Sequence, residues 1–177
     1  MFDGMIFATD ENIFDVYTRF QTTEESKEAM LQRPDGVLVG KLLADQKGFK
    51  LGDKVRTKAS FKHEDGTFNW EFEVVGFYTV KNLTGDELGI MANYKYIDDS
   101  RMTMKGTTGY IIAEVLSPEL ADGISNKIDK NFENSDRATR SGPENQLAME
   151  MVGDFGDIEL IMNLILSAVF FTILLVT

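Results

Sequence analysis

The chain has 177 residues, enough for one ordinary domain or two small lobes with a hydrophobic core. It contains no cysteine, which excludes disulfides and thiolate metal sites. Its formal net charge is −11 and its lysines are interspersed with carboxylates, so the sequence lacks the concentrated basic surface that nucleic-acid binding needs. The N-terminal apolar run is short and has no basic region before it, which argues against a signal peptide.

The first elements follow from local signals. Short apolar runs within residues 5–20 favour a strand followed by an irregular connection. Thr22, with Glu25 three positions later, predicts the N-cap of a helix that Pro34 ends. A second helix is predicted from apolar residues at helical spacing and from a glycine placed as a left-handed C-terminal cap: Val37, Leu38, Leu42, Leu43 and Gly48.

A β-hairpin is predicted next. Gly52 and Asp53 mark a turn into a strand over residues 54–63, and the Asp65-Gly66 pair is typical of tight hairpin turns. The returning strand alternates strictly, so we expect one of its faces to lie in the core; this face consists of Phe68, Trp70, Phe72 and Val74.

The rest of the polar part mixes helices and strands. Residues 81–105 read as loops around a short apolar piece at 88–91, and residues 109–116 are predicted as a strand. Ser117 and Pro118 start a helix with one apolar face, formed by Leu120, Ile124, Ile128 and Phe132. A last short strand is expected around residues 136–141, and Pro143 opens another helix. Together with the hairpin, this order predicts an α+β fold.

The last part of the chain is strongly apolar. A helix over residues 158–177 would cover roughly 30 Å, the thickness of a bilayer's hydrocarbon core. Charged side chains are absent from residue 161 onward. The alternative is a buried C-terminal helix in a soluble core, but such helices usually keep a polar stripe. We therefore expect a polar domain over residues 1–157 and a transmembrane helix over residues 158–177, in a piece of a longer membrane protein.

No catalytic, cofactor or metal site is predicted. His63, the single histidine, has no partner at the spacing of a metal site or a general base, and we expect it to be an exposed turn residue. Asp98 and Asp99 fit a solvated acidic face, because no calcium-loop pattern surrounds them.

Two short motifs are treated as coincidental. Asp154, Phe155 and Gly156 spell the magnesium motif of kinases, but no phosphate loop or catalytic loop precedes them. Asn82, with Thr84, forms a glycosylation sequon that matters only in a eukaryotic secretory pathway. These observations predict a protein that is not an enzyme.

The order of several motifs resembles a known family. A glycine-rich segment with Gly40, Gly48 and Gly52-Asp53 precedes a strand that carries Val74-Val75-Gly76. This order is similar to the extracytoplasmic core domain of MacB-like ABC transporter permeases. The C-terminal residues resemble the entry into the FtsX-like permease domain, where the second membrane helix follows.

The resemblance implies a two-lobed domain, with one porter-like α/β lobe and one mostly β lobe, on the periplasmic side of the bacterial inner membrane. It also implies that the family's first membrane helix and first strand-helix piece are missing here. The expected partners are a cytoplasmic ABC ATPase, a second permease subunit, the lipid bilayer, and a periplasmic adaptor or lipoprotein. The function implied is to transmit ATP-driven motion during export or extraction of a substrate. The alternative is a membrane-tethered binding or assembly module without transport activity, and an enzyme is the third choice.

Overall fold

The computed structural model describes residues 5–81, 85–147, 162–167, 169, 171 and 172. They form two compact units, Met1–Ala113 and Glu114–Thr177. The first unit mixes helices with a mixed sheet and the second contains helix α5, so the α+β expectation is confirmed. The described part of the chain carries no helix that is long and apolar enough to cross a membrane.

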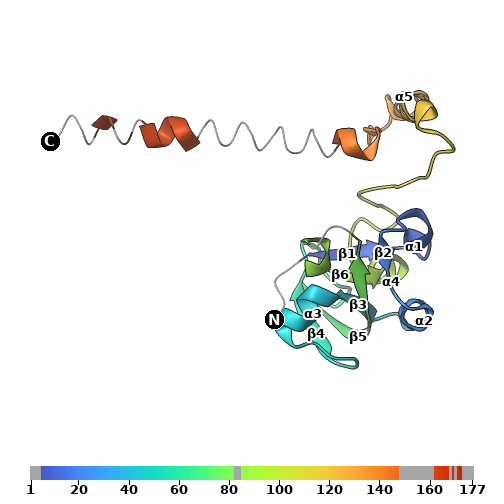
Figure 1. Cartoon of the computed structure of the whole chain (residues 1–177), viewed down its shortest axis with the longest axis vertical. Helices are drawn as coiled ribbons and strands as arrows, with labels where there is room; N and C mark the ends of the chain where they lie inside the picture. Colours follow the sequence, from blue (N-terminus) through green and yellow to red (C-terminus); the bar gives the residue numbers. More distant parts are fainter. Residues whose placement is uncertain (1–4, 82–84, 148–161, 168, 170, 173–177) are drawn as a thin grey trace. The chain divides into compact units, whose positions relative to one another are not determined.

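The first unit is built on a six-stranded sheet with the order β1-β6-β3-β5-β2, and β4 also pairs with β5 (Figure 1). The strand bounds are β1 Ile6–Thr9, β2 Phe20–Gln21, β3 Gly36–Gly40, β4 Lys54–Lys58, β5 Asn69–Val80 and β6 Ile90–Asn93. Pairing is parallel for β1 with β6 and for β3 with β5, and antiparallel for the other pairs. The predicted hairpin is therefore confirmed, although its first strand ends at Lys58 rather than at residue 63.

Short helices connect these strands. Their bounds are α1 Ile13–Val16, α2 Glu24–Gln32, α3 Lys41–Lys47 and α4 Tyr94–Ser100, with a 3-10 turn η1 at Gly85–Leu88. The N-cap of α2 is Thr23, whose Oγ1 accepts from the Ser26 N–H at 3.2 Å. The predicted cap, Thr22, instead donates its hydroxyl to the Phe77 carbonyl at 2.9 Å, so that prediction was wrong by one residue.

The region after Pro34 differs from the predicted helix. Val37 and Leu38 lie in β3, all of whose residues are buried, and only the following residues form α3. A run of four or five apolar residues fits a fully buried strand as well as it fits part of a helix. Gly48, at φ +74°, caps α3 in the left-handed conformation, as predicted.

The sheet has a hydrophobic cluster on each face. One contains Val37, Val39, Leu43, Val55, Trp70, Phe72, Val74 and Ile90, and the other contains Met30, Leu38, Tyr78, Val80 and Met91. Neighbouring residues of β3 point into different clusters, as the two-residue period of a strand requires. Phe68 precedes β5 and is exposed, so only three of the four residues predicted for the core face lie in the core.

A β-bulge divides β5 into two halves. Val37 pairs with Val74, whereas the next residue, Leu38, pairs with Gly76. Side-chain direction alternates along a strand with a period of two. The extra residue, Val75, shifts this alternation by one position, so even-numbered residues after the bulge face the opposite side of the sheet from those before it. For this reason Trp70 and Tyr78 belong to different clusters although they are an even number of positions apart.

The second unit contains a 3-10 turn η2 at Pro118–Leu120 and the helix α5 at Ala121–Phe132. The helix predicted after Ser117 is therefore confirmed. The strands predicted at residues 109–116 and 136–141 are absent, since both segments are extended or bent chain without a strand partner in the part that the structure describes. Residues 144–147 are helical, as Pro143 predicted.

Candidate functional site

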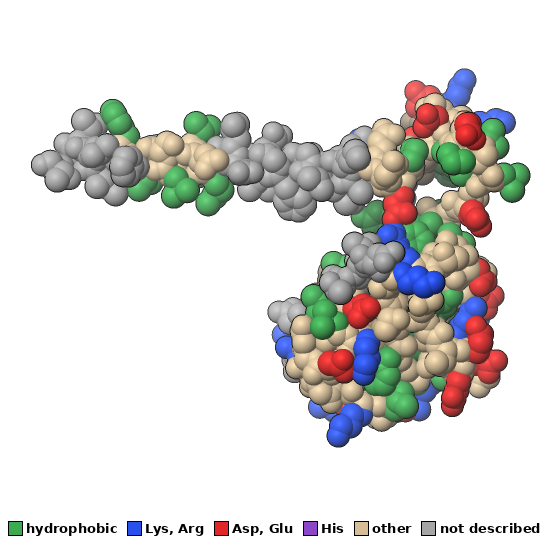
Figure 2. Space-filling view, in the orientation of Figure 1, with side chains coloured by type: hydrophobic (Ala, Val, Ile, Leu, Met, Phe, Trp, Pro, Cys, Tyr) green, Lys and Arg blue, Asp and Glu red, His purple; other side chains and the backbone are tan. Residues whose placement is uncertain are grey.

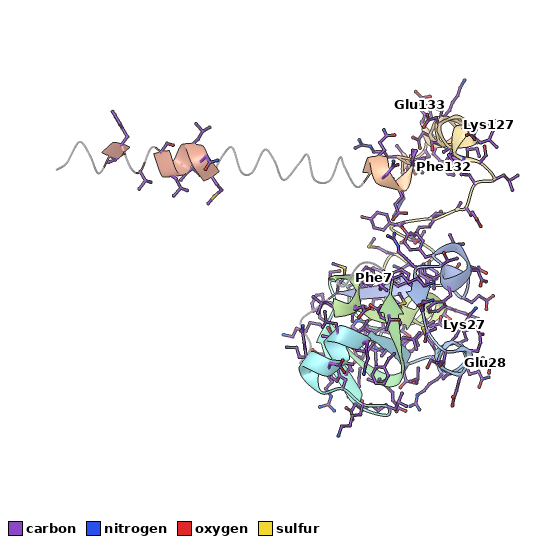
Figure 3. All side chains as sticks on the ribbon, in the orientation of Figure 1. Phe7, Lys27, Glu28, Lys127, Phe132 and Glu133 are labelled. Atoms are coloured by element: carbon purple, nitrogen blue, oxygen red, sulfur yellow. The ribbon has the colours of Figure 1, made fainter. Side chains whose placement is uncertain are left out.

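The first unit carries an open groove of about 1270 Å³. Its lining comes from β1, α1, α4, the aromatic residues that precede and begin β5, and the chain at residues 107–112. Phe7 of β1, labelled in Figure 3, is one of these residues. A volume of this size exceeds that of a typical small-molecule pocket, so the groove has room for an extended ligand.

An aromatic cluster forms one wall of the groove. Trp70 is buried, stacks on Phe72 and meets the edge of Phe61 at a centroid distance of 5.5 Å. Its indole N–H donates to the Phe61 carbonyl at 3.4 Å. Trp70 is the single tryptophan of the chain and one of the groove-lining residues, so the tryptophan fluorescence of the protein reports on the surroundings of this side chain.

His63 packs against the same cluster. Its ring lies edge-on to Trp70 at 4.7 Å, and its backbone forms an isolated β-bridge with Arg101. The side chain is 22% exposed, so the expectation of an exposed turn residue was wrong. The sequence shows the polar neighbours of His63 but not the aromatic surface that the hairpin brings to it.

Arg101 is the most buried charge of the groove lining, with 8% of its surface exposed. One guanidinium nitrogen, Nη2, is ion-paired with Asp98 and also donates to the Thr107 carbonyl at 2.7 Å. The backbone N–H of Gly106 donates to both carboxylate oxygens of Asp98, at 2.9 and 3.0 Å. Asp98 and Arg101 thus fasten the loop of residues 102–108 to α4.

The charge state of Asp98 follows from these contacts. Burial raises its pKa, but the hydrogen bonds from Gly106 and Arg101 outweigh burial, and the net pKa lies below the ordinary value of 3.8. Asp98 is therefore an ionised structural anchor and not part of a solvated acidic face. Within the described residues no three histidine or acidic side chains are grouped as a metal site.

Two polar side-chain atoms of the described residues are buried without a hydrogen-bond partner. They are Thr9 Oγ1 and Arg101 Nε, and both residues line the groove. Buried polar atoms in native proteins are nearly always satisfied, so an exception needs an explanation. The sequence analysis singles out neither residue. The one available signal was that Arg101 follows Asp98 by three positions near the end of a helix, a spacing at which oppositely charged side chains can pair.

The second unit presents an apolar helix face. Leu120, Ile124, Ile128 and Phe132 follow each other at spacings of four residues along η2 and α5, and each is between 39% and 49% exposed. Figure 2 shows hydrophobic side chains open on this helix, and Figure 3 labels Phe132 with the charged Lys127 and Glu133. Asp129 accepts from Thr139 Oγ1 and from the Ser141 N–H, both at 3.0 Å, which holds the following segment beside α5.

Several predicted features lie outside the described residues. The sequon at residues 82–84, the triplet at 154–156 and the proposed boundary between residues 157 and 158 belong to this group. Of the predicted membrane helix, residues 162–167, 169, 171 and 172 are described and are helical.

Comparisons with known proteins add no assignment. Neither the protein-family models nor the curated proteins contain a match to this chain.

Proposed function

We propose that the chain is the extracytoplasmic part of an ABC transporter permease subunit that transmits ATP-driven motion across the membrane. The observation that carries the proposal is the order of the motifs: Gly40, Gly48, Gly52-Asp53 and Val74-Val75-Gly76, followed by the apolar C-terminal stretch.

The positions of these glycines support the motif reading, because each one has a physical need for glycine. Gly48 and Gly52 have φ values of +74° and +83°, which other residues rarely adopt. A Cβ atom on Gly40 would lie 2.1 Å from the Glu87 carbonyl oxygen, and one on Gly76 would lie 2.4 Å from Ser26 Oγ. Glycines required in this way are a firmer basis for a motif than glycines in open loops.

The described residues near the C-terminus support a lipid environment for that stretch. Leu164, Ile165 and Leu166 are consecutive in a helix, and each is more than half exposed. Consecutive helix positions point in directions about 100° apart, so these side chains cover more than one face. Apolar side chains on several faces suit lipid, whereas a helix on a soluble core keeps a polar side.

The finer parts of the proposal concern architecture and partners. We assign the domain to the periplasmic side of the bacterial inner membrane, with residues 158–177 as the second membrane helix and a two-lobed, MacB-like arrangement outside. The partners are a cytoplasmic ABC ATPase, a second permease subunit and a periplasmic adaptor or lipoprotein. Catalysis belongs to the ATPase, and the subunit itself holds no cofactor.

The experiment is proximity labelling in the native cells. A biotin ligase fused to the proposed cytoplasmic ABC ATPase partner should label the protein, and removal of residues 158–177 should abolish the labelling. Labelling restricted to envelope proteins unrelated to transport would contradict the proposal. A full-length protein with one span and no ATPase neighbour would instead favour a membrane-tethered assembly module.

A further inference from the structure

The groove of the first unit runs along the open edge of strand β1. All four residues of β1 line it, together with Trp70 and Phe72 from the hydrophobic cluster on one face of the sheet and Met91 from the cluster on the other face. A sheet separates its two faces, so one continuous groove can touch both clusters only where the sheet ends. The groove therefore follows the side of β1 that has no neighbouring strand.

This edge of β1 presents free backbone groups. β1 is the terminal strand of the sheet and pairs with β6 alone. Among the described residues, the backbone of Ile6–Thr9 makes no hydrogen bond on its other side. Sheet edges are commonly guarded by charged residues, proline, a bulge or a covering segment, and β1 contains neither a charged residue nor a proline. A covering segment would therefore protect this edge.

Residues 109–113, here called the strap, have the composition of a strand but no strand partner. Tyr110, Ile111 and Ile112 are of the aromatic and β-branched types that favour strands, and they are 77%, 86% and 48% exposed. In the described part of the chain no backbone–backbone hydrogen bond includes the strap, and its Tyr110 carbonyl accepts from Thr108 Oγ1 at 3.0 Å. The same three residues line the groove. An unpaired strand-forming segment therefore borders an unpaired strand edge within one unit.

The start of the strap is held near the C-terminal end of β1. The Thr107 carbonyl accepts from Tyr94 Oη at 3.1 Å and from Arg101 Nη2 at 2.7 Å. Tyr94 directly follows Asn93, which pairs with Thr9 at the end of β1. A chain that leaves this point along the edge runs antiparallel to β1. Five extended residues cover roughly 16 Å, which is enough to span the four residues of β1, at about 13 Å.

We infer that the strap adds to β1 as an antiparallel edge strand and closes the groove. Side chains alternate along a strand, so Ile111 covers one face of the sheet edge while Tyr110 and Ile112 cover the other. The pairing satisfies the free backbone groups of β1 and removes three large apolar side chains from water. The strap leads into Glu114, the first residue of the second unit, so a docked strap also fixes the point at which the chain enters that unit.

The inference does not rest on the transporter proposal, because it uses contacts of the first unit alone. Its test is disulfide cross-linking, which is clean because the chain has no cysteine of its own. The full chain is kept in solution with an amphipathic polymer, and Ala8→Cys in β1, an exposed position, is combined with a cysteine at each of residues 110–115 in turn. The pairs are oxidised mildly and separated on a non-reducing gel.

The expected result is an intramolecular disulfide whose yield is highest at one strap position. The yield should be about tenfold lower at both neighbours of that position, because their side chains point to the opposite face. When Ile6→Cys replaces Ala8→Cys, the best partner should move two positions toward the C-terminus, as antiparallel pairing requires. The control pair is Leu51→Cys with Ile111→Cys, since Leu51 is exposed and lies outside the groove lining.

Hydrogen exchange of the chain without added cysteines gives a second, independent measurement. The strap amides should be protected, and Ile111→Asp should lower their protection factors by about tenfold, because docking would bury the new carboxylate. Leu116→Asp is the matched control, since Leu116 is even more exposed but lies beyond the reach of β1, and it should leave the strap amides unchanged. Both substituted side chains are exposed, so neither variant should unfold the protein.

Four outcomes would overturn the inference. The first is a disulfide yield no higher than that of the control pair. The second is an equal yield at neighbouring strap positions, or a best partner that moves toward the N-terminus with Ile6→Cys. The third is disulfide-linked dimers in place of cross-linked monomers, which would show that a second copy occupies the edge of β1. The fourth is strap protection that Ile111→Asp leaves unchanged.

Discussion

The two units of the chain differ in how far their regular elements bury their apolar side chains. In the first, strands β3, β5 and β6 bury valine, isoleucine and aromatic side chains on both faces of one sheet. In the second, η2 and α5 together carry an equally regular apolar face, yet each of its four large residues is between 39% and 49% exposed. A periodic pattern therefore predicts which side chains share a face, but burial depends on whether another element covers that face.

Among side-chain truncations, the largest expected difference is between two phenylalanines. Phe72 is 1% exposed and stacks on Trp70, so Phe72→Ala should lower the free energy of unfolding by about 3–5 kcal/mol. Phe132→Ala removes a side chain that is 46% exposed and should cost less than about 1 kcal/mol. Urea unfolding followed by Trp70 fluorescence and by circular dichroism measures both. Equal losses in the free energy of unfolding would mean that another segment or molecule covers the apolar face of α5 in solution.

Glycine substitutions should have opposite signs in the two units. Gly40→Ala brings a Cβ atom to 2.1 Å from the Glu87 carbonyl, so the backbone must shift, at a cost of about 1–3 kcal/mol. Gly123 of α5 has no atom within 4 Å of the corresponding position, and Gly123→Ala should strengthen the helix by about 0.5–1 kcal/mol. Thermal melts of the two variants test this contrast. If Gly40→Ala leaves the stability unchanged, η1 can move away from β3.

Acid should loosen one loop in each unit. The pKa of Asp98 is lowered by its bonds from Gly106 and Arg101 despite burial, and the pKa of Asp129 is lowered by its bonds from Ser141. A lowered folded-state pKa stabilises the fold above the ordinary value near 3.8, and this stabilisation is lost as the pH falls through the lower value. The protection factors of the Gly106 and Ser141 amides, that is, their exchange rates relative to an unfolded peptide at the same pH, should therefore fall below about pH 4. In the Asp98→Asn variant, the Gly106 amide should exchange rapidly at neutral pH, while exchange of the Ser141 amide is unaffected. Continued protection of the Gly106 amide in that variant would contradict the proposed anchoring role of Asp98.

The smallest effect is expected at Leu116. This side chain is 99% exposed, so Leu116→Glu should change the free energy of unfolding by less than about 0.5 kcal/mol. A matched substitution, Leu38→Glu, places a charge in a fully buried strand and should prevent folding. Loss of stability in Leu116→Glu would reveal a cover over residues 109–116, in which case the strand predicted there forms with a partner.

Elements with short-range signals could be predicted from the sequence. The helix before Pro34, the left-handed cap at Gly48 and the hairpin turn at Gly66 each depend on residues within a few positions of one another. Helix α4 was missed because residues 94–100 combine aromatic and acidic residues without an apolar stripe. The bulge at Val75 was missed because the alternation of β5 looks regular up to Val74, and Gly76 was the local warning.

The groove could not be predicted for a different reason. Thr9, Trp70 and Arg101 come from segments separated by dozens of residues, and each looks ordinary in its own segment. Their significance depends on tertiary packing, which leaves two of them with an unsatisfied atom. No short-range pattern contains this information.

The central claim is that the polar part of the chain lies outside the cytoplasmic membrane and is anchored by the apolar C-terminal stretch. The chain has no cysteine. Glu28→Cys on the exposed face of α2 therefore gives a single label site, provided that any cysteine elsewhere in the full-length protein is replaced. The measurement is reaction with a membrane-impermeant maleimide in spheroplasts, followed by extraction of the membranes with alkaline carbonate. The account predicts labelling before lysis and a protein that stays with the membrane; labelling only after lysis, or release into the supernatant, would contradict it.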